Sequence, residues 1–253
     1  MIKYVLFVHG KTSPSLDQIF EAVTNTLPKH QYVLDRFTAK FPEFEKDCAQ
    51  KGDSSCFMHT PVSTIAEALR DQIETKRREL PADTEIIFVG KSAGGIPLAM
   101  LQRKFCLANK IAYLGSAIVA SDVSTVDTYA ARNMYDGWVG RIIRAHNGES
   151  ILPPTFSSNE LSRTPTLFLH GEFDDDAHNG DRTINPNYEK YEGNTGYSFL
   201  RQNSLSLARQ VILNWTVREI PQADHSFRLT IGPKPKQLSP IFLEEFVGWL
   251  AAK

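Results

Sequence analysis

Three short segments of the sequence carry the residue types of a nucleophilic hydrolase. Residues 90–94 (GKSAG) form a G-x-S-x-G pattern, which holds a serine hydroxyl on a tight turn between a strand and a helix. Residues 170–176 (HGEFDDD) supply adjacent aspartates, and residues 221–227 (PQADHSF) supply a histidine. A serine becomes a nucleophile when a histidine accepts its proton and a carboxylate fixes the tautomer of that histidine. The chain therefore offers Ser92 as nucleophile and His225 as general base.

The residues around Ser92 predict the strand and the helix that such a turn requires. Residues 86–89 (IIFV) form a short apolar run rich in β-branched side chains, typical of a strand buried on both faces of a parallel sheet. Residues 96–101 (IPLAML) begin an apolar helix. The amides after Ser92 then open a helix, whose positive dipole end favours an oxyanion. The alternative is a glycine-rich turn or phosphate-binding loop without a catalytic serine.

Strands and helices alternate along the rest of the chain. Further short apolar runs predict strands at residues 4–8, 111–114 and 165–169, a more mixed segment predicts one at 32–37, and residues 215–220 predict the last. Amphipathic spacing predicts a helix over residues 16–27. A capping box at Thr64 and Glu67 predicts the start of another helix, and Ser239 followed by Pro240 predicts the start of the last. This alternation indicates an α/β fold with a mostly parallel sheet of about six strands and helices on both faces.

The candidate catalytic residues all follow predicted strands. In an open parallel sheet, ligands bind beyond the carboxyl ends of the strands, so catalytic groups belong in the segments that follow them. Ser92 follows strand 86–89, the aspartates follow strand 165–169, and His225 follows strand 215–220. We therefore expect the three groups at one edge of the sheet.

The chain resembles the α/β-hydrolase superfamily in motifs that span nearly its whole length. These are a strand followed by His9-Gly10, the G-x-S-x-G elbow, the H-G-x-x-D segment at residues 170–174 and the D-H-S-F segment at residues 224–227. The order Ser, Asp, His is also the order of that superfamily. The GKSAGG elbow and the ADHSF loop look like those of small carboxylesterases and dienelactone-hydrolase-like serine hydrolases. The first strands of the usual eight are missing, which leaves about six.

The resemblance implies a role for each candidate residue. It implies a catalytic triad of Ser92, Asp174 and His225. Asp174 is selected over its neighbours Asp175 and Asp176 because it stands three residues after the His-Gly pair, as in the superfamily. The neighbours remain the alternatives for the orienting acid.

The resemblance also implies an oxyanion hole and a reaction. The backbone N–H groups of Ala93 and Lys11 would bind the oxyanion. The implied reaction is cleavage of a carboxylic ester of a small or medium acyl substrate through an acyl-enzyme, with no metal and no organic cofactor. A thioesterase is the nearest alternative, because it needs the same groups and differs only in its pocket. A binding or scaffold protein is the alternative from another class, since a fold does not fix a function.

Composition and charge limit the kinds of molecule that the protein is expected to bind. A length of 253 residues suits a single α/β domain, and a net charge of −1 gives no electrostatic footprint for nucleic acid or an anionic membrane. No C-x-x-C or H-E-x-x-H pattern indicates a metal site. The first apolar run is too short for a signal peptide, and no stretch approaches the roughly 18 apolar residues of a membrane helix. We expect a cytoplasmic protein with a small-molecule ester substrate, in an oligomeric state that the sequence leaves open.

Two segments depart from the alternation. Residues 38–62 form a charged connection longer than a usual loop between a strand and a helix. Residues 117–164 mix aromatic and basic side chains and are expected to form a small cap or lid. The three cysteines, an odd number without an export signal, indicate reduced thiols, although Cys48 and Cys56 could form a local bridge.

Overall fold

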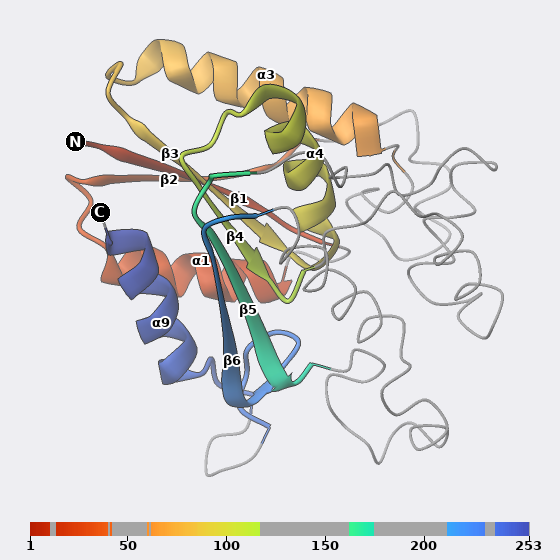
Figure 1. Ribbon diagram of the computed structural model, residues 1–253. Coiled ribbons are helices and arrows are strands. Elements are labelled where there is room, and N and C mark those ends of the chain that lie inside the picture. Colours follow the sequence, from red (N-terminus) through yellow and green to blue (C-terminus); the bar gives the residue numbers. More distant parts are fainter. Residues whose placement is uncertain are drawn as a thin grey trace, which may run out of the picture.

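Six parallel strands form one sheet at the centre of the computed structural model (Figure 1). The structure describes residues 1–10, 14–39, 41, 60, 62–116, 162–174, 212–230 and 236–252. The strands are β1 (Lys3–Val8), β2 (Tyr32–Arg36), β3 (Glu85–Lys91), β4 (Lys110–Leu114), β5 (Thr166–Phe173) and β6 (Trp215–Asp224). Their order is β2-β1-β3-β4-β5-β6, and every neighbouring pair is parallel. The predicted six-stranded parallel sheet is confirmed.

Helices cover both faces of the sheet, as the alternation predicts (Figure 1). Helices α1 (Pro14–Thr26) and α9 (Pro240–Ala251) lie on one face, and helices α3 (Val62–Glu79) and α4 (Gly95–Phe105) lie on the other. In β1, the side chains of Tyr4, Leu6 and Val8 pack in the core under α3 and α4, whereas Val5 and Phe7 pack under α1 and α9. Because both faces are buried, the strand carries a continuous apolar run.

The first residues of helices α3 and α9 can be compared with the capping residues that the sequence predicts. Helix α3 begins at Val62, so Thr64 lies inside its first turn and the predicted capping box at Thr64 and Glu67 is wrong. The Val62 side chain packs in the core between the sheet and helices α3 and α4. Burial of this apolar side chain favours a helix that starts at Val62, two residues before Thr64. Helix α9 begins as predicted, because the Ser239 hydroxyl accepts a hydrogen bond from the Phe242 N–H at 3.4 Å.

The last two strands are longer than the sequence predicts. Strand β5 continues through residues 170–173 and β6 through residues 221–224, where the sequence indicates loops. The two strands stay paired to their last residues across a β-bulge. The chain therefore leaves both strands at the same level of the sheet, at the bottom of the view in Figure 1, with Asp174 and His225 as the next residues.

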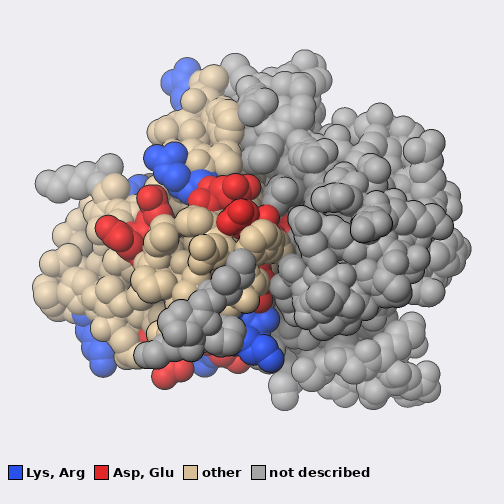
Figure 2. All heavy atoms as spheres, turned by 90° about the horizontal axis from the view of Figure 1, so that it is seen from below, with Lys and Arg blue, Asp and Glu red and all other residues tan. Residues whose placement is uncertain are grey.

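Several expectations fall outside the described residues. The predicted cap at 117–164 does so except for residues 162–164, and so do most of 38–62, Cys48 and Cys56. Among the helices that the structure describes, none is long and apolar enough to cross a membrane. On the face seen in Figure 2, acidic and basic side chains both occur, in keeping with the small net charge.

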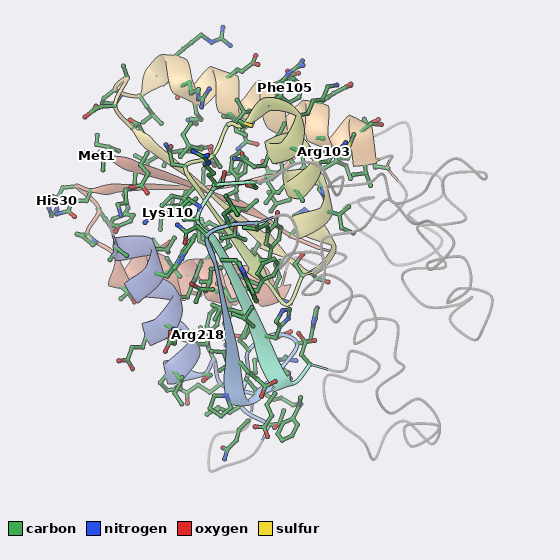
Figure 3. The ribbon with its side chains drawn as sticks, viewed as in Figure 1. Met1, His30, Arg103, Phe105, Lys110 and Arg218 are labelled. Carbon is green, nitrogen blue, oxygen red and sulfur yellow. The ribbon has the colours of Figure 1, made fainter. Side chains whose placement is uncertain are left out.

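Two buried lysines hold the C-terminal end of α9 at the amino edge of the sheet. The Lys3 ammonium donates a hydrogen bond to the Leu250 carbonyl at 2.7 Å, and the Lys110 ammonium donates one to the Ala252 carbonyl. Glu85 lies 3.5 Å from each ammonium. Figure 3 labels Lys110 near this end of α9. The positive charges offset the negative end of the helix dipole, and they lie at the opposite edge of the sheet from Asp174 and His225.

Candidate active site

Ser92 lies on a strained turn between β3 and α4. Its backbone φ is 53°, in the left-handed region that residues with a side chain rarely adopt. It opens a short 3-10 helix, η3 (Ser92–Gly94), which runs directly into α4. The Ser116 hydroxyl donates a hydrogen bond to the Ser92 carbonyl and so ties the turn to the end of β4. The side chain of Ser92 is partly exposed, which is the geometry of a nucleophile elbow.

Both glycines of the G-x-S-x-G motif are required by close backbone contacts. A Cβ atom at Gly90 would lie 2.5 Å from the Cα atom of Gly95, where β3 meets the start of α4. A Cβ atom at Gly94 would lie 2.4 Å from the carbonyl oxygen of Val8, at the end of β1. These distances are too short for any side chain, so the elbow can form against its neighbouring strands only with glycine at both positions.

Asp174 and His225 are joined by a short hydrogen bond. The Nδ1 atom of His225 lies 2.6 Å from the Oδ1 atom of Asp174. The Asp174 side chain is fully buried, and the His225 side chain is 18% exposed. An ionised carboxylate only accepts hydrogen bonds, so Nδ1 carries the proton and the lone pair of a neutral imidazole is on Nε2. That tautomer is the one a general base needs.

The charges around Asp174 keep its carboxyl group ionised. Burial on its own would raise the pKa of Asp174, but the charge and hydrogen bond of His225, followed by the charges of Lys91 and His170, lower the pKa below its ordinary value. The Nδ1 atom of His170 lies 4.0 Å from Asp174 Oδ2. A carboxylate in this state can orient a histidine and stabilise its imidazolium form.

Gly115, directly after β4, connects the elbow with the Asp174–His225 pair. Its φ is +51°, and a Cβ atom there would lie 3.0 Å from Asp174 Oδ2, 3.2 Å from His225 Nδ1 and 3.2 Å from Lys91 Nζ. Lys91 immediately precedes Ser92. The three strand ends of β3, β5 and β6 therefore bring these groups around one point, as expected for the carboxyl edge of a parallel sheet.

The remaining predicted site residues are only partly described. Ala93 is the second residue of η3, so its backbone N–H lies at the opening of the helical segment after Ser92. Lys11, the other expected oxyanion donor, lies outside the described residues, as do Asp175 and Asp176.

Sequence reasoning missed three residues of this site, namely Lys91, Gly115 and His170. The signal for Gly115 was a glycine directly after a predicted strand, the place where catalytic groups gather. Lys91 and His170 stand within the G-x-S-x-G and H-G-x-x-D motifs, just beyond the predicted strands, and nothing in the sequence indicates that both side chains are buried.

Comparison with known proteins establishes the fold. No family model matches the chain, and no curated protein matches it. Solved structures do match. An α/β-hydrolase enzyme from a lagoon-sediment metagenome matches with a TM-score of 0.52 and 14% identity, over 99% of this chain and 89% of its own. Est1E from Butyrivibrio proteoclasticus matches with a TM-score of 0.57 and 12% identity, over 98% of this chain and 87% of its own.

A dienelactone hydrolase from Anabaena variabilis is also similar, with a TM-score of 0.51 and 13% identity over 98% of this chain and 83% of its own. Identities this low bear on the fold alone. Together with the six-stranded parallel sheet and its two helical layers, they show that the chain has the α/β-hydrolase fold, as the sequence motifs predict.

Proposed function

We propose that this α/β-hydrolase-fold protein is a serine hydrolase that cleaves carboxylic esters of small or medium acyl substrates through an acyl-enzyme. The observation that carries this function is the 2.6 Å hydrogen bond between Asp174 and His225, at the sheet edge where Ser92 occupies a strained elbow. Two of the structurally similar proteins are an esterase from a marine microorganism and a dienelactone hydrolase, which supports ester chemistry on this fold.

The proposed reaction begins with proton transfer from serine to histidine. The Ser92 hydroxyl attacks the ester carbonyl while Nε2 of His225 takes its proton, and Asp174 stabilises the imidazolium that forms. The backbone N–H groups of Ala93 and Lys11 would bind the oxyanion of the tetrahedral intermediate. The imidazolium then gives its proton to the departing alcohol. A water molecule, activated by the same histidine, releases the acid and restores Ser92.

Covalent labelling tests whether Ser92 is a nucleophile. A fluorophosphonate probe should react with the native protein, and peptide mass spectrometry should find the adduct on Ser92, because an activated serine attacks phosphorus as it attacks a carbonyl. Heat-denatured protein is the control and should stay unlabelled, since denaturation separates Ser92 from His225. Native protein that also stays unlabelled would point to a binding or scaffold protein.

A substrate panel separates an esterase from a thioesterase. Hydrolysis of p-nitrophenyl esters of increasing acyl length should exceed hydrolysis of the acyl-CoA thioesters with the same acyl groups. The comparison uses kcat/KM, because this quantity reports the discrimination between competing substrates. A higher kcat/KM for the thioesters would reassign the substrate class and leave the catalytic residues unchanged.

A further inference from the structure

A lysine is buried inside the candidate active site. Lys91 is the last residue of β3 and directly precedes Ser92, and only 1% of its surface is exposed. Its ammonium lies 5.6 Å from the centre of the Phe227 ring. Among the described residues, the Nζ atom has no hydrogen-bond partner. A buried charge is unfavourable unless opposite charges compensate it, so the groups that face Lys91 decide what it does.

Charged and titratable groups face Lys91 from two neighbouring strands. From the end of β5 this is Asp174, which has His170 Nδ1 4.0 Å from its Oδ2 atom, and from the end of β6 and the turn after it they are Asp224, His225 and Arg228. The Nζ atom of Lys91 and the Oδ2 atom of Asp174 border the same point beside Gly115. Asp174 is also the carboxylate whose charge acts most strongly on the ammonium.

Asp224 is already compensated by other groups. Its Oδ2 atom accepts two hydrogen bonds from the guanidinium of Arg228, at 2.9 and 3.1 Å. Its Oδ1 atom accepts hydrogen bonds from the backbone N–H groups of Ser226 and Arg228, at 2.7 and 2.9 Å. The positive charge of Arg228 therefore offsets part of the effect of Asp224 on Lys91, because Arg228 lowers the pKa of Lys91 where Asp224 raises it. The ammonium of Lys91 consequently acts mainly on Asp174.

We infer that Lys91 is a positioning residue of the proposed hydrolase, whose ammonium acts through the Asp174 carboxylate and sets the pH range in which His225 is a neutral base. The assignment takes its catalytic meaning from the function proposed above. While Lys91 is charged, it shares the negative charge of Asp174 with His225 and disfavours a second positive charge beside it. The histidine then stays neutral, and able to accept a proton, to a lower pH than it would beside Asp174 alone.

The ionisation of Lys91 itself agrees with this role. Burial lowers the pKa of Lys91 to about 8, although the charges of Asp174 and Asp224 act in the opposite direction. The ammonium is therefore mostly charged at neutral pH and loses its charge in mild alkali. Its influence on His225 should fade over the same range.

Histidine NMR on the Lys91→Met variant tests this inference without reference to activity. Methionine keeps the length and volume of the side chain and removes the charge. With ¹⁵N-labelled histidine, the imidazole signals of His225 should titrate about one pH unit higher in the variant than in the wild type, because a nearby positive charge is gone. Lys110→Met is the matched control, since Lys110 is also buried but lies at the amino edge of the sheet, and it should leave the His225 titration in place.

Two more variants separate the charge of Lys91 from its packing. Lys91→Arg keeps a positive charge and should titrate close to the wild type, whereas Lys91→Gln should follow Lys91→Met. An unchanged His225 titration in Lys91→Met, or equal displacement in Lys91→Arg and Lys91→Met, would overturn the inference. If ester hydrolysis is measurable, the acid limb of the pH profile of kcat/KM should move with the NMR titration. A displaced titration in a protein without hydrolase activity would instead contradict the proposed function and leave the electrostatic coupling in place.

Discussion

Replacing Ser92 with alanine should lower kcat for ester hydrolysis by a factor on the order of 10⁵ to 10⁶, because the acyl-enzyme can no longer form. Ser92 is partly exposed at the carboxyl edge of the sheet, so loss of its hydroxyl removes no core packing. The variant should therefore unfold at the temperature of the wild type. Single-turnover assays with a p-nitrophenyl ester measure the remaining rate, and thermal unfolding followed by circular dichroism measures stability.

Ser63 offers a matched control for this substitution. It is an exposed serine in the first turn of α3, a helix that carries none of the proposed catalytic residues. Ser63→Ala deletes the same hydroxyl group and should keep the full turnover. If Ser92→Ala hydrolysed the ester at the wild-type rate, another residue would be the nucleophile and the elbow would have only a structural role.

Replacing Asp174 with asparagine should lower kcat by a factor on the order of 10⁴ while the fold is retained. The asparagine side chain has the same shape, but its amide group can donate a hydrogen bond to Nδ1 of His225. The imidazole would then carry its proton on Nε2 and could not accept one from Ser92. Steady-state kinetics measure the loss, and NMR of ¹⁵N-labelled histidine shows directly which ring nitrogen holds the proton.

The neighbouring aspartates supply the comparison for this variant. Asp175→Asn and Asp176→Asn remove one negative charge from the same segment and should change kcat by less than about tenfold, because the carboxylate of Asp174 already occupies Nδ1 of His225. A severe loss in either of these variants, together with an active Asp174→Asn, would mean that the orienting acid is another residue of the segment.

The parts of the fold that the sequence predicts are those set by local patterns. Continuous apolar runs predicted the four inner strands β1, β3, β4 and β5, since strands buried on both faces cannot carry an alternating pattern. The edge strands β2 and β6 were predicted from more mixed segments, because each leaves part of its surface exposed. Ser239 and Pro240 located the start of α9 because capping depends on adjacent residues. The G-x-S-x-G motif predicted the elbow for a similar reason, as its glycines avoid collisions with the next few residues and with β1.

Features that depend on contacts between residues far apart in the chain could not be predicted from the sequence. Strands β5 and β6 continue past their predicted ends because each pairs with the other, and neither segment reveals how far that pairing extends. The position of Gly115 beside Asp174 depends on how the ends of β4 and β5 meet across the sheet. Lys91 appeared as the variable residue of a motif, and its burial against Asp174 follows from tertiary packing alone.

The buried ammonium of Lys91 also links the stability of the fold to pH. An unfolded lysine has an ordinary pKa of 10.5, whereas burial lowers the pKa of Lys91 in the fold to about 8. Between these two values the unfolded chain binds more protons than the folded chain, so the free energy of unfolding rises with pH across that window. Below it, the charged lysine costs about 3 kcal/mol of stability. An apolar side chain in place of Lys91 would make the folded protein more stable. A buried charge that lowers stability is of the kind that proteins retain at functional sites.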